Sequence, residues 1–479
     1  MKFGSLGNAG ENAVFQAPFY MERKGEMKNY MILEVLAGKA VGLRFEEMDG
    51  QTVTKLKLCL MDALECCMAA NSVDSRIVGA FESIRQYRSG GPCLLFGTGL
   101  RANAAEAAFY NGVTGSVSSR NDISKEGSCH PGAVVVPVAL ALGEERRTGG
   151  REVLESMAVG YETMIRLGRA LKKAGIERAL RMTALVAPFG AAFAAAKAMG
   201  LPGDQTMWAA GFACNRAFGL NNWAVEGTGE DVFQNAWGAE TGISAARLAS
   251  VGTRASGRAL EGKDGLLQAF GAEETAGYIL EELGERLFLQ DVEFKPMDSC
   301  FKLQAPCQAA ARITHMPEFL RDEVERVVIR VSRHARYHAG SDNREIVSAV
   351  QAIMSIPFGV SYVLVNGDYR KICWDPPCQD QVRALMDRCE LVEDERYTAL
   401  FPGKHGAMVT VWLRNGVKLE AEQEDVRSLT ELETAQRFLG TAAEFAGPSA
   451  YWTGSDSEKK DLASSTKSLS AGEIAGPSG

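Results

Sequence analysis

Apolar residues recur three and four positions apart along the first half of the chain, between breaks made by Gly, Pro and Asn. This spacing puts the apolar side chains on one face of a helix, so residues 30–271 are predicted to form amphipathic helices that pack on one another. The clearest predicted helices are 53–70, 104–111, 151–173, 183–199 and 237–251. The last two are so rich in Ala and Gly that we expect their backbones to approach closely.

The pattern changes after Lys295. β-branched residues in partial alternation fill 324–331 and 407–413, which is typical of strands. Asn415-Gly416 then supplies a strong hairpin turn signal. A smaller α+β domain is therefore predicted, followed by a short helix near 428–445 that returns to the helical domain.

The composition is that of a folded protein with more than one domain. A chain of 479 residues exceeds the roughly 250–300 at which one hydrophobic core usually stops growing, and 46% of its residues are hydrophobic. We predict a mainly α protein with a large all-helical domain over 28–286, completed by 423–450, and a smaller α+β lid domain over 287–422. Residues 453–479 are polar and free of aromatic residues, so a disordered tail is expected there.

The charge, the apolar segments and the cysteine spacing argue against nucleic acid, a membrane or a metal as a partner. The net charge of -8 comes with no Lys/Arg-rich run, so nucleic acid is not an expected partner. The N-terminus lacks the apolar stretch of a signal peptide, and the longest apolar window, 184–201, is interrupted by Pro188 and Lys197. The eleven cysteines follow no metal-binding or disulfide spacing. We expect a cytoplasmic protein that does not bind a membrane or a metal.

The most informative segment is a helix ending at Asn111-Gly112, a polar loop, and His130-Pro131 before an apolar helix. Proline suits the first turn of a helix, so His130 is predicted to stand at a helix N-terminus. The free N–H groups and positive dipole end at that place could hold a carboxylate while the imidazole moves a proton. A lone histidine here could also be only a cap.

The surrounding sequence favours the catalytic interpretation, because this segment resembles the MmgE/PrpD family. That family includes 2-methylcitrate dehydratase, cis-aconitate decarboxylase and iminodisuccinate epimerase. Further matching motifs follow in order over most of the chain and begin at Met61, Gly190, Gly242, Leu260 and Lys295. The resemblance implies an active site between a helical domain and a lid domain, no metal or organic cofactor, and a homodimer.

His130 matches the family pattern, but several other positions depart from it. The family's residue is replaced at Ser116, Ser119, Asn121, Arg181, Gln304 and, by the simplest register, Asp231. Of an acidic run before His130 only Asp122 survives. Three of these replacements remove an imidazole and one removes a lysine, which suggests a pocket charged for a different substrate.

The candidate catalytic residues are His130 and Asp122 as bases and Lys125 and Tyr337 as proton donors. The candidate substrate-binding residues are Arg181, Thr183, Lys295, Cys300, Gln304, Asn121 and Asp231. For Arg181 and Lys295 the alternative is an ordinary surface ion pair, and for Cys300 it is a small buried side chain. His334 and His338 are expected on a strand end and loop, where the lid contributes to the pocket.

The resemblance and these residues together predict an enzyme that abstracts the α-proton of a small polycarboxylate or derivative. Dehydration and decarboxylation, the lyase outcomes, come first, and epimerisation or isomerisation follows. The alternative is a catalytically silent family member that acts as a binding or scaffold protein. Convergence of the candidate residues on one cavity would favour the enzyme, and a filled or dispersed site would favour the scaffold.

Overall fold

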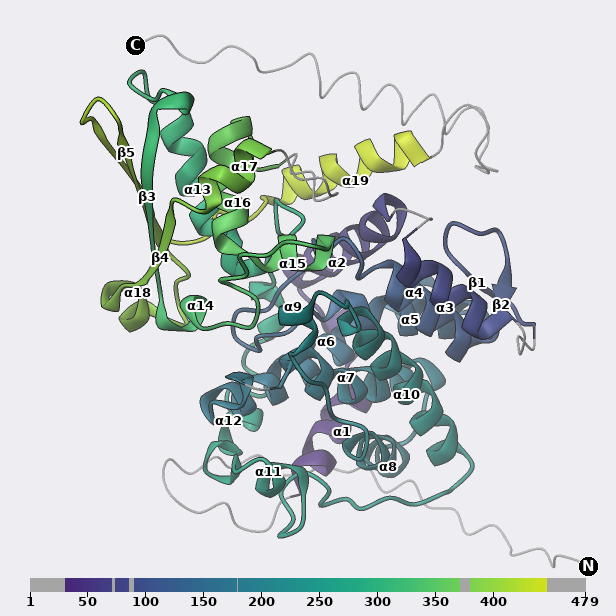
Figure 1. Cartoon of the computed structure of the whole chain (residues 1–479). Helices are drawn as coiled ribbons and strands as arrows, with labels where there is room; N and C mark the ends of the chain where they lie inside the picture. Colours follow the sequence, from purple (N-terminus) through teal and green to yellow (C-terminus); the bar gives the residue numbers. More distant parts are fainter. Residues whose placement is uncertain (1–30, 71–73, 86–89, 179, 371–379, 446–479) are drawn as a thin grey trace, which may run out of the picture. The chain divides into compact units, whose positions relative to one another are not determined.

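The computed structural model describes residues 31–70, 74–85, 90–178, 180–370 and 380–445. The first half is helical (Figure 1). Its longer helices are α1 (Ile32–Gly42), α2 (Gly50–Ala69), α3 (Ser75–Arg85), α4 (Ala104–Thr114), α5 (Gly132–Arg146), α6 (Gly150–Lys173), α7 (Met182–Met199), α8 (Gly203–Cys214) and α10 (Asp231–Ser250). Its shorter elements are α9 (Trp223–Glu226), α11 (Leu266–Ala269), α12 (Gly277–Leu280) and the antiparallel pair β1 (Cys93–Leu94) and β2 (Arg101–Ala102).

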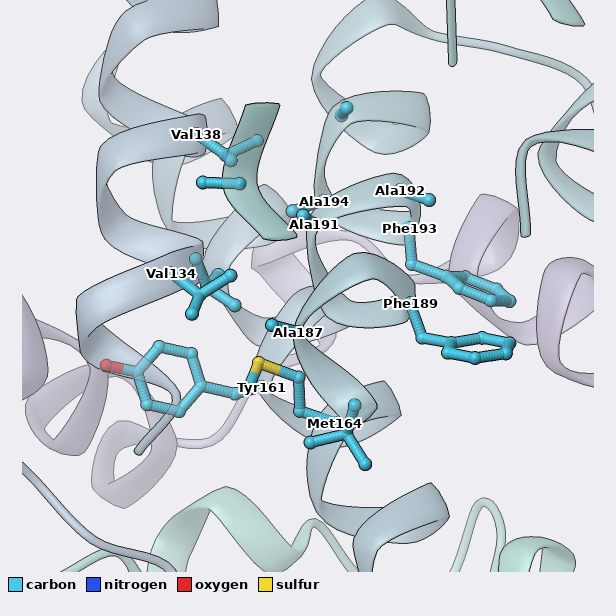
Figure 2. Close-up of a cluster of buried hydrophobic side chains, with 14 of the residues drawn as sticks. Val134, Val138, Tyr161, Met164, Ala187, Phe189, Ala191, Ala192, Phe193 and Ala194 are labelled. Carbon is cyan, nitrogen blue, oxygen red and sulfur yellow. The ribbon is translucent and has the colours of Figure 1, made fainter. Parts of the chain in front are cut away.

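Helix α7 forms the centre of this part and packs against α5, α6, α8 and α10. Figure 2 shows Val134 and Val138 of α5 and Tyr161 and Met164 of α6 beside the alanines of α7. By length and composition α7 could cross a membrane, but 83% of its apolar window is buried inside the protein. Its hydropathy is therefore that of a core helix.

The expected close approach of the Ala- and Gly-rich helices is confirmed where α10 packs on α7. A Cβ atom added to Gly242 would lie 2.2 Å from the Cβ of Ala191, so a larger residue at 242 would push the helices apart. Helix α10 begins earlier than the predicted residue 237, at Asp231. Its first turn was missed because Asp231 and Asn235 are polar yet buried, which breaks the apolar periodicity used to find it.

The second half holds a four-stranded sheet in the order β4-β3-β5-β6. β3 (Val324–Val331) and β5 (Ala407–Leu413) have the predicted bounds, and β4 (Cys389–Glu393) and β6 (Lys418–Gln423) flank them. β4 runs parallel to β3, whereas the other pairs are antiparallel. The predicted hairpin turn joins β5 to β6, with Gly416 at φ 86°, a conformation that favours glycine.

Helices cover this sheet and connect its strands. They are α13 (Phe301–Thr314), α14 (Arg333–Arg336), α15 (Ala349–Met354), α16 (Ile356–Asn366), α17 (Asp380–Met386) and α18 (Glu395–Leu400). α13 packs on α16 and on β5 and β6, and the apolar side chains form a hydrophobic cluster separate from that of the first half. The mainly α architecture with a small α+β part is thus confirmed.

The last described helix, α19 (Glu431–Phe445), packs on α2, as the predicted return to the helical part requires (Figure 1). The hydrophobic cluster of the first half extends to Phe294, eight residues past the predicted boundary after 286. The domain limits 28–286, 287–422 and 423–450 stay predictions. The expected disorder of 453–479 concerns residues outside those described.

Candidate functional site

A cavity of about 510 Å³ lies at the meeting of the helical part and the sheet-containing part. Its walls come from the loop before α5, the starts of α7 and α10, the segment leading into α13, and the region after β3. The predicted site residues that line it are Asn121, Lys125, His130, Arg181, Thr183, Asp231, Lys295, Cys300 and Tyr337. Residues far apart in the sequence are therefore brought to one cavity.

His130 ends the polar loop that leads into α5. Its Nδ1 lies 2.7 Å from the backbone carbonyl oxygen of Asp122, and since a carbonyl only accepts, Nδ1 carries the proton and Nε2 the lone pair. The backbone N–H of His130 donates to Thr183 Oγ1 at 3.2 Å. Burial, together with the charges of Lys295 and Arg181, holds the pKa of His130 well below its usual range. The imidazole is thus a neutral, oriented base.

Asp122 lies behind His130 and not on the cavity wall. It is 0% exposed, and its carboxylate accepts the Gly132 N–H at 2.9 Å and the Tyr161 O–H at 2.7 Å. At the N-terminus of α5 a protein carboxylate, that of Asp122, accepts the first N–H, and the binding of a substrate carboxylate there stays a prediction. A Cβ at Gly132 would lie 2.9 Å from both carboxylate oxygens, so this contact depends on glycine. Asp122 positions His130 and does not fit the predicted role of base.

A buried ionic network continues behind Asp122. Asp62 of α2 accepts the Asp122 N–H at 2.9 Å and is ion-paired with Arg437 of α19, which also lies 3.3 Å from Glu65. Arg437 donates in addition to the Lys295 carbonyl oxygen at 2.7 Å. Burial raises the pKa of both Asp62 and Asp122. Helix α19 is thereby tied to the backbone on either side of the site.

Arg181 lies at the start of α7 with only 12% of its side chain exposed, so its pair with Asp231 is not a surface ion pair. Its Nη1 donates to Asn235 Oδ1 at 2.6 Å and to the Asp231 carbonyl at 3.1 Å, while Nη2 is 3.9 Å from Asp231 Oδ2. The guanidinium lies 5.9 Å from the centre of the Trp223 ring. Asn235 in turn donates to Ser116 Oγ at 2.9 Å. Burial raises the pKa of Asp231 and lowers that of Arg181.

Lys295 is also buried, at 1% exposed, and donates to the carbonyl oxygens of Ser119 and Ser299. Its burial lowers the pKa of the ammonium group. Gln304 does not line the cavity. It is 0% exposed and donates to the Met297 carbonyl at 3.1 Å and to Ser299 Oγ at 2.9 Å, so its predicted contact with a substrate has no support from its position and stays a prediction. It fixes the turn that carries Lys295 instead.

The two predicted proton donors differ in their surroundings. Lys125 is held between Glu293 at 2.7 Å and Asp425 at 2.9 Å, and these carboxylates outweigh burial and raise its pKa. Tyr337 stands at the rim and is 69% exposed. Proton return by either residue stays a prediction.

Comparison with known proteins identifies the family of this chain. The profile of the MmgE/PrpD N-terminal domain matches residues 34–278, and that of the MmgE/PrpD C-terminal domain matches residues 298–434. The chain belongs to the MmgE/PrpD family. A curated relative is the cis-aconitate decarboxylase-like protein oryM of Aspergillus oryzae (strain ATCC 42149 / RIB 40), 28% identical over 218 residues. That match covers 44% of this chain and 45% of the relative, so it spans less than half of either protein.

Sequence reasoning missed part of the site of this MmgE/PrpD protein. Lys302, His405 and Trp223 also line the cavity, and none of them is a residue of the family motifs described above. His338 also lines it, as expected of a lid residue, although its stretch is the short helix α14 and a turn and not a strand end. Within the described ranges no three His, Cys, Asp or Glu side chains could together hold a metal ion.

Proposed function

We propose that this protein is a lyase-type enzyme that abstracts the α-proton of a small polycarboxylate or a close derivative. The observation that carries the proposal is the neutral His130, whose Nε2 is left without a proton by the Nδ1 hydrogen bond, on the wall of a cavity that also holds Arg181 and Lys295. A base and two cations are what the removal of a proton next to a carboxylate needs.

The chemistry proceeds in steps that these residues can serve. His130 Nε2 takes the α-proton, and the electron pair left on carbon spreads onto the adjacent carboxylate. Arg181 and Lys295 stabilise the added negative charge. A β-hydroxyl group that takes a proton and leaves as water completes a dehydration, and return of a proton to the opposite face completes an epimerisation. In a decarboxylation the C–CO2 bond breaks in place of the C–H bond, the same cations stabilise the electron pair left on carbon, and a protonated group of the site then delivers a proton to that carbon.

Family membership and the named relative support a lyase ahead of an isomerase. The relative is called decarboxylase-like, and the two family models match residues 34–278 and 298–434, which include residues of both walls of the cavity. A catalytically silent scaffold is less well supported, because the cavity is open and His130, Arg181 and Lys295 all line it, although Asp122 and Gln304 lie behind. A cofactor-free reaction, a homodimer and a cytoplasmic location belong to the same proposal.

A direct screen tests the proposed reaction. The purified protein is incubated in D2O with a panel of di- and tricarboxylates and their hydroxy and amino derivatives, and each compound is followed by mass spectrometry. We expect one compound to lose water, to lose CO2, or to gain one deuterium. If every compound is bound weakly or not at all and none changes mass, the silent scaffold is the better description.

A further inference from the structure

Lys302 differs from the other cations of the cavity in what surrounds it. Lys125 and Arg333 are ion-paired with carboxylates, Arg181 donates to Asn235 and the Asp231 carbonyl, and Lys295 donates to two carbonyl oxygens. Among the residues that the structure describes, Lys302 Nζ makes no salt bridge and no hydrogen bond, and the carboxylate of Glu177 acts on it only through its charge. An ammonium group that lines a cavity without a partner has its charge available for a ligand.

The position of Lys302 is fixed by the residues around it. It lies in the first turn of α13, and its Nζ is 4.8 Å from the centre of the Phe401 ring. His334 stacks on the same ring at 3.7 Å, and His405 meets its edge at 5.1 Å. Lys302 is therefore held by an aromatic contact that forms no salt bridge with its ammonium group.

One polar atom beside Lys302 also lacks a hydrogen-bond partner in the described part of the chain. His405 Nε2 is buried and has no hydrogen-bond partner among the described residues. Burial and the Lys302 charge lower the pKa of His405 and that of His338, the latter to about 3, so both imidazoles are neutral. A neutral imidazole can donate an N–H to an anion beside a lysine.

Three of the cations that line the cavity interact electrostatically with one residue of its wall. That residue is Cys300, and the three cations are Arg181, Lys295 and Lys302. A ligand with a single carboxylate would neutralise the Arg181 and Lys295 end and leave Lys302 unpaired. A ligand with a second carboxylate would pair with Lys302 as well.

We propose that Lys302 binds a second carboxylate of the substrate and so selects dicarboxylates over monocarboxylates of the same length. This inference rests on the proposed function, since it assumes that the cavity binds carboxylates. Lys302 acts here as a specificity-determining residue, and His130 remains the base.

Calorimetric titration with succinate and butyrate, which have equal chain length, tests the proposal. The wild type should bind succinate more tightly than butyrate, and Lys302→Met should reduce that preference on the order of tenfold or more, because one charged hydrogen bond is lost. Lys302→Arg should keep the preference, since it keeps the charge. Lys418→Met, which removes an exposed lysine of β6 that is paired with Glu420, is the matched control and should change nothing.

The outcomes separate this inference from the proposed function. If the folded Lys302→Met protein prefers succinate as strongly as the wild type, Lys302 does not bind the second carboxylate, and the polycarboxylate proposal stands without it. Equal preferences in Lys302→Met and Lys302→Arg would likewise overturn the role of the charge. If the wild type binds neither anion, both proposals fail.

Discussion

The two walls of the cavity are built in different ways. On the helical wall, His130 is held by the Asp122 carbonyl and Thr183, and Arg181 is held by Asn235 and Asp231. On the sheet-containing wall, His405 Nε2 has no hydrogen-bond partner among the described residues, and Lys302 Nζ contacts the Phe401 ring there. A wall whose polar groups are fixed in advance suits the reacting atoms, because geometry limits the rate there. A wall with a lysine that makes no salt bridge is suited to select substrates by their charge.

The largest expected effect is on the helical wall. Replacing His130 with Gln keeps its size but removes the titratable group, so kcat should fall by about 10²–10⁴-fold. The free energy of unfolding should change little, and urea denaturation with the same preparation checks this. An unfolded His130→Gln protein would assign a structural role to the histidine.

The next effect concerns the network that supports this wall. Arg437→Met leaves the buried Asp62 without its ion-pair partner and removes one cation from the buried Glu65, which keeps Arg120. The free energy of unfolding should fall by about 3–5 kcal/mol at neutral pH. The control is Arg427→Met, whose exposed pair with Glu433 should contribute about 1 kcal/mol or less.

The same variant has a pH signature. Burial raises the pKa of Asp62 to about 6, so its carboxyl is protonated and needs no partner below that pH. The deficit of Arg437→Met should therefore shrink as the pH falls from 7 to 5. A deficit that stays constant over this range would show that the charge of Asp62 does not contribute to it.

The activity of the wild type should also depend on pH in one direction. Because burial and two nearby cations lower the pKa of His130, the neutral base persists as the pH falls below 6.5. The acidic limb of kcat/KM, which reports the free enzyme, should lie below 6.5. A limb centred above 6.5 would mean that His130 is solvated or paired with an acid.

The smallest effect is expected at the rim of the second wall. Tyr337 is exposed to water, so Tyr337→Phe should change kcat by less than about tenfold. A residue that acts as the general acid would contribute about 10²-fold or more. A loss of 10²-fold or more at unchanged stability would identify Tyr337 as the residue that returns the proton.

Most of the fold could be predicted from the sequence, because helices and strands are encoded by local patterns of residues. The bounds of β3 and β5 come from β-branched runs, and the helices from apolar spacing that the core then buries. The start of α10 did not follow, since Asp231 and Asn235 are polar residues buried against Arg181. Only tertiary contact explains their burial.

The site was predictable where a motif carries it and not elsewhere. His130, Arg181 and Lys295 were found through the family pattern and line the cavity. Whether Asp122 faces a substrate or the N–H of Gly132 depends on how the loop folds back on α5, which spacing does not encode. Lys302 was not predicted as a site residue, because its surroundings in the cavity are visible only in the structure.

Proton abstraction by His130 is tested most directly by exchange of the substrate α-proton with solvent. The wild type and folded His130→Gln protein are incubated in D2O with a compound that the screen has identified, and the α-proton signal is followed by NMR together with product formation. We expect turnover or deuterium incorporation with the wild type and a rate lower by about 10²–10⁴-fold with His130→Gln. Breakage of the α-C–H bond at the wild-type rate in the folded variant would contradict the assignment of His130 as the base.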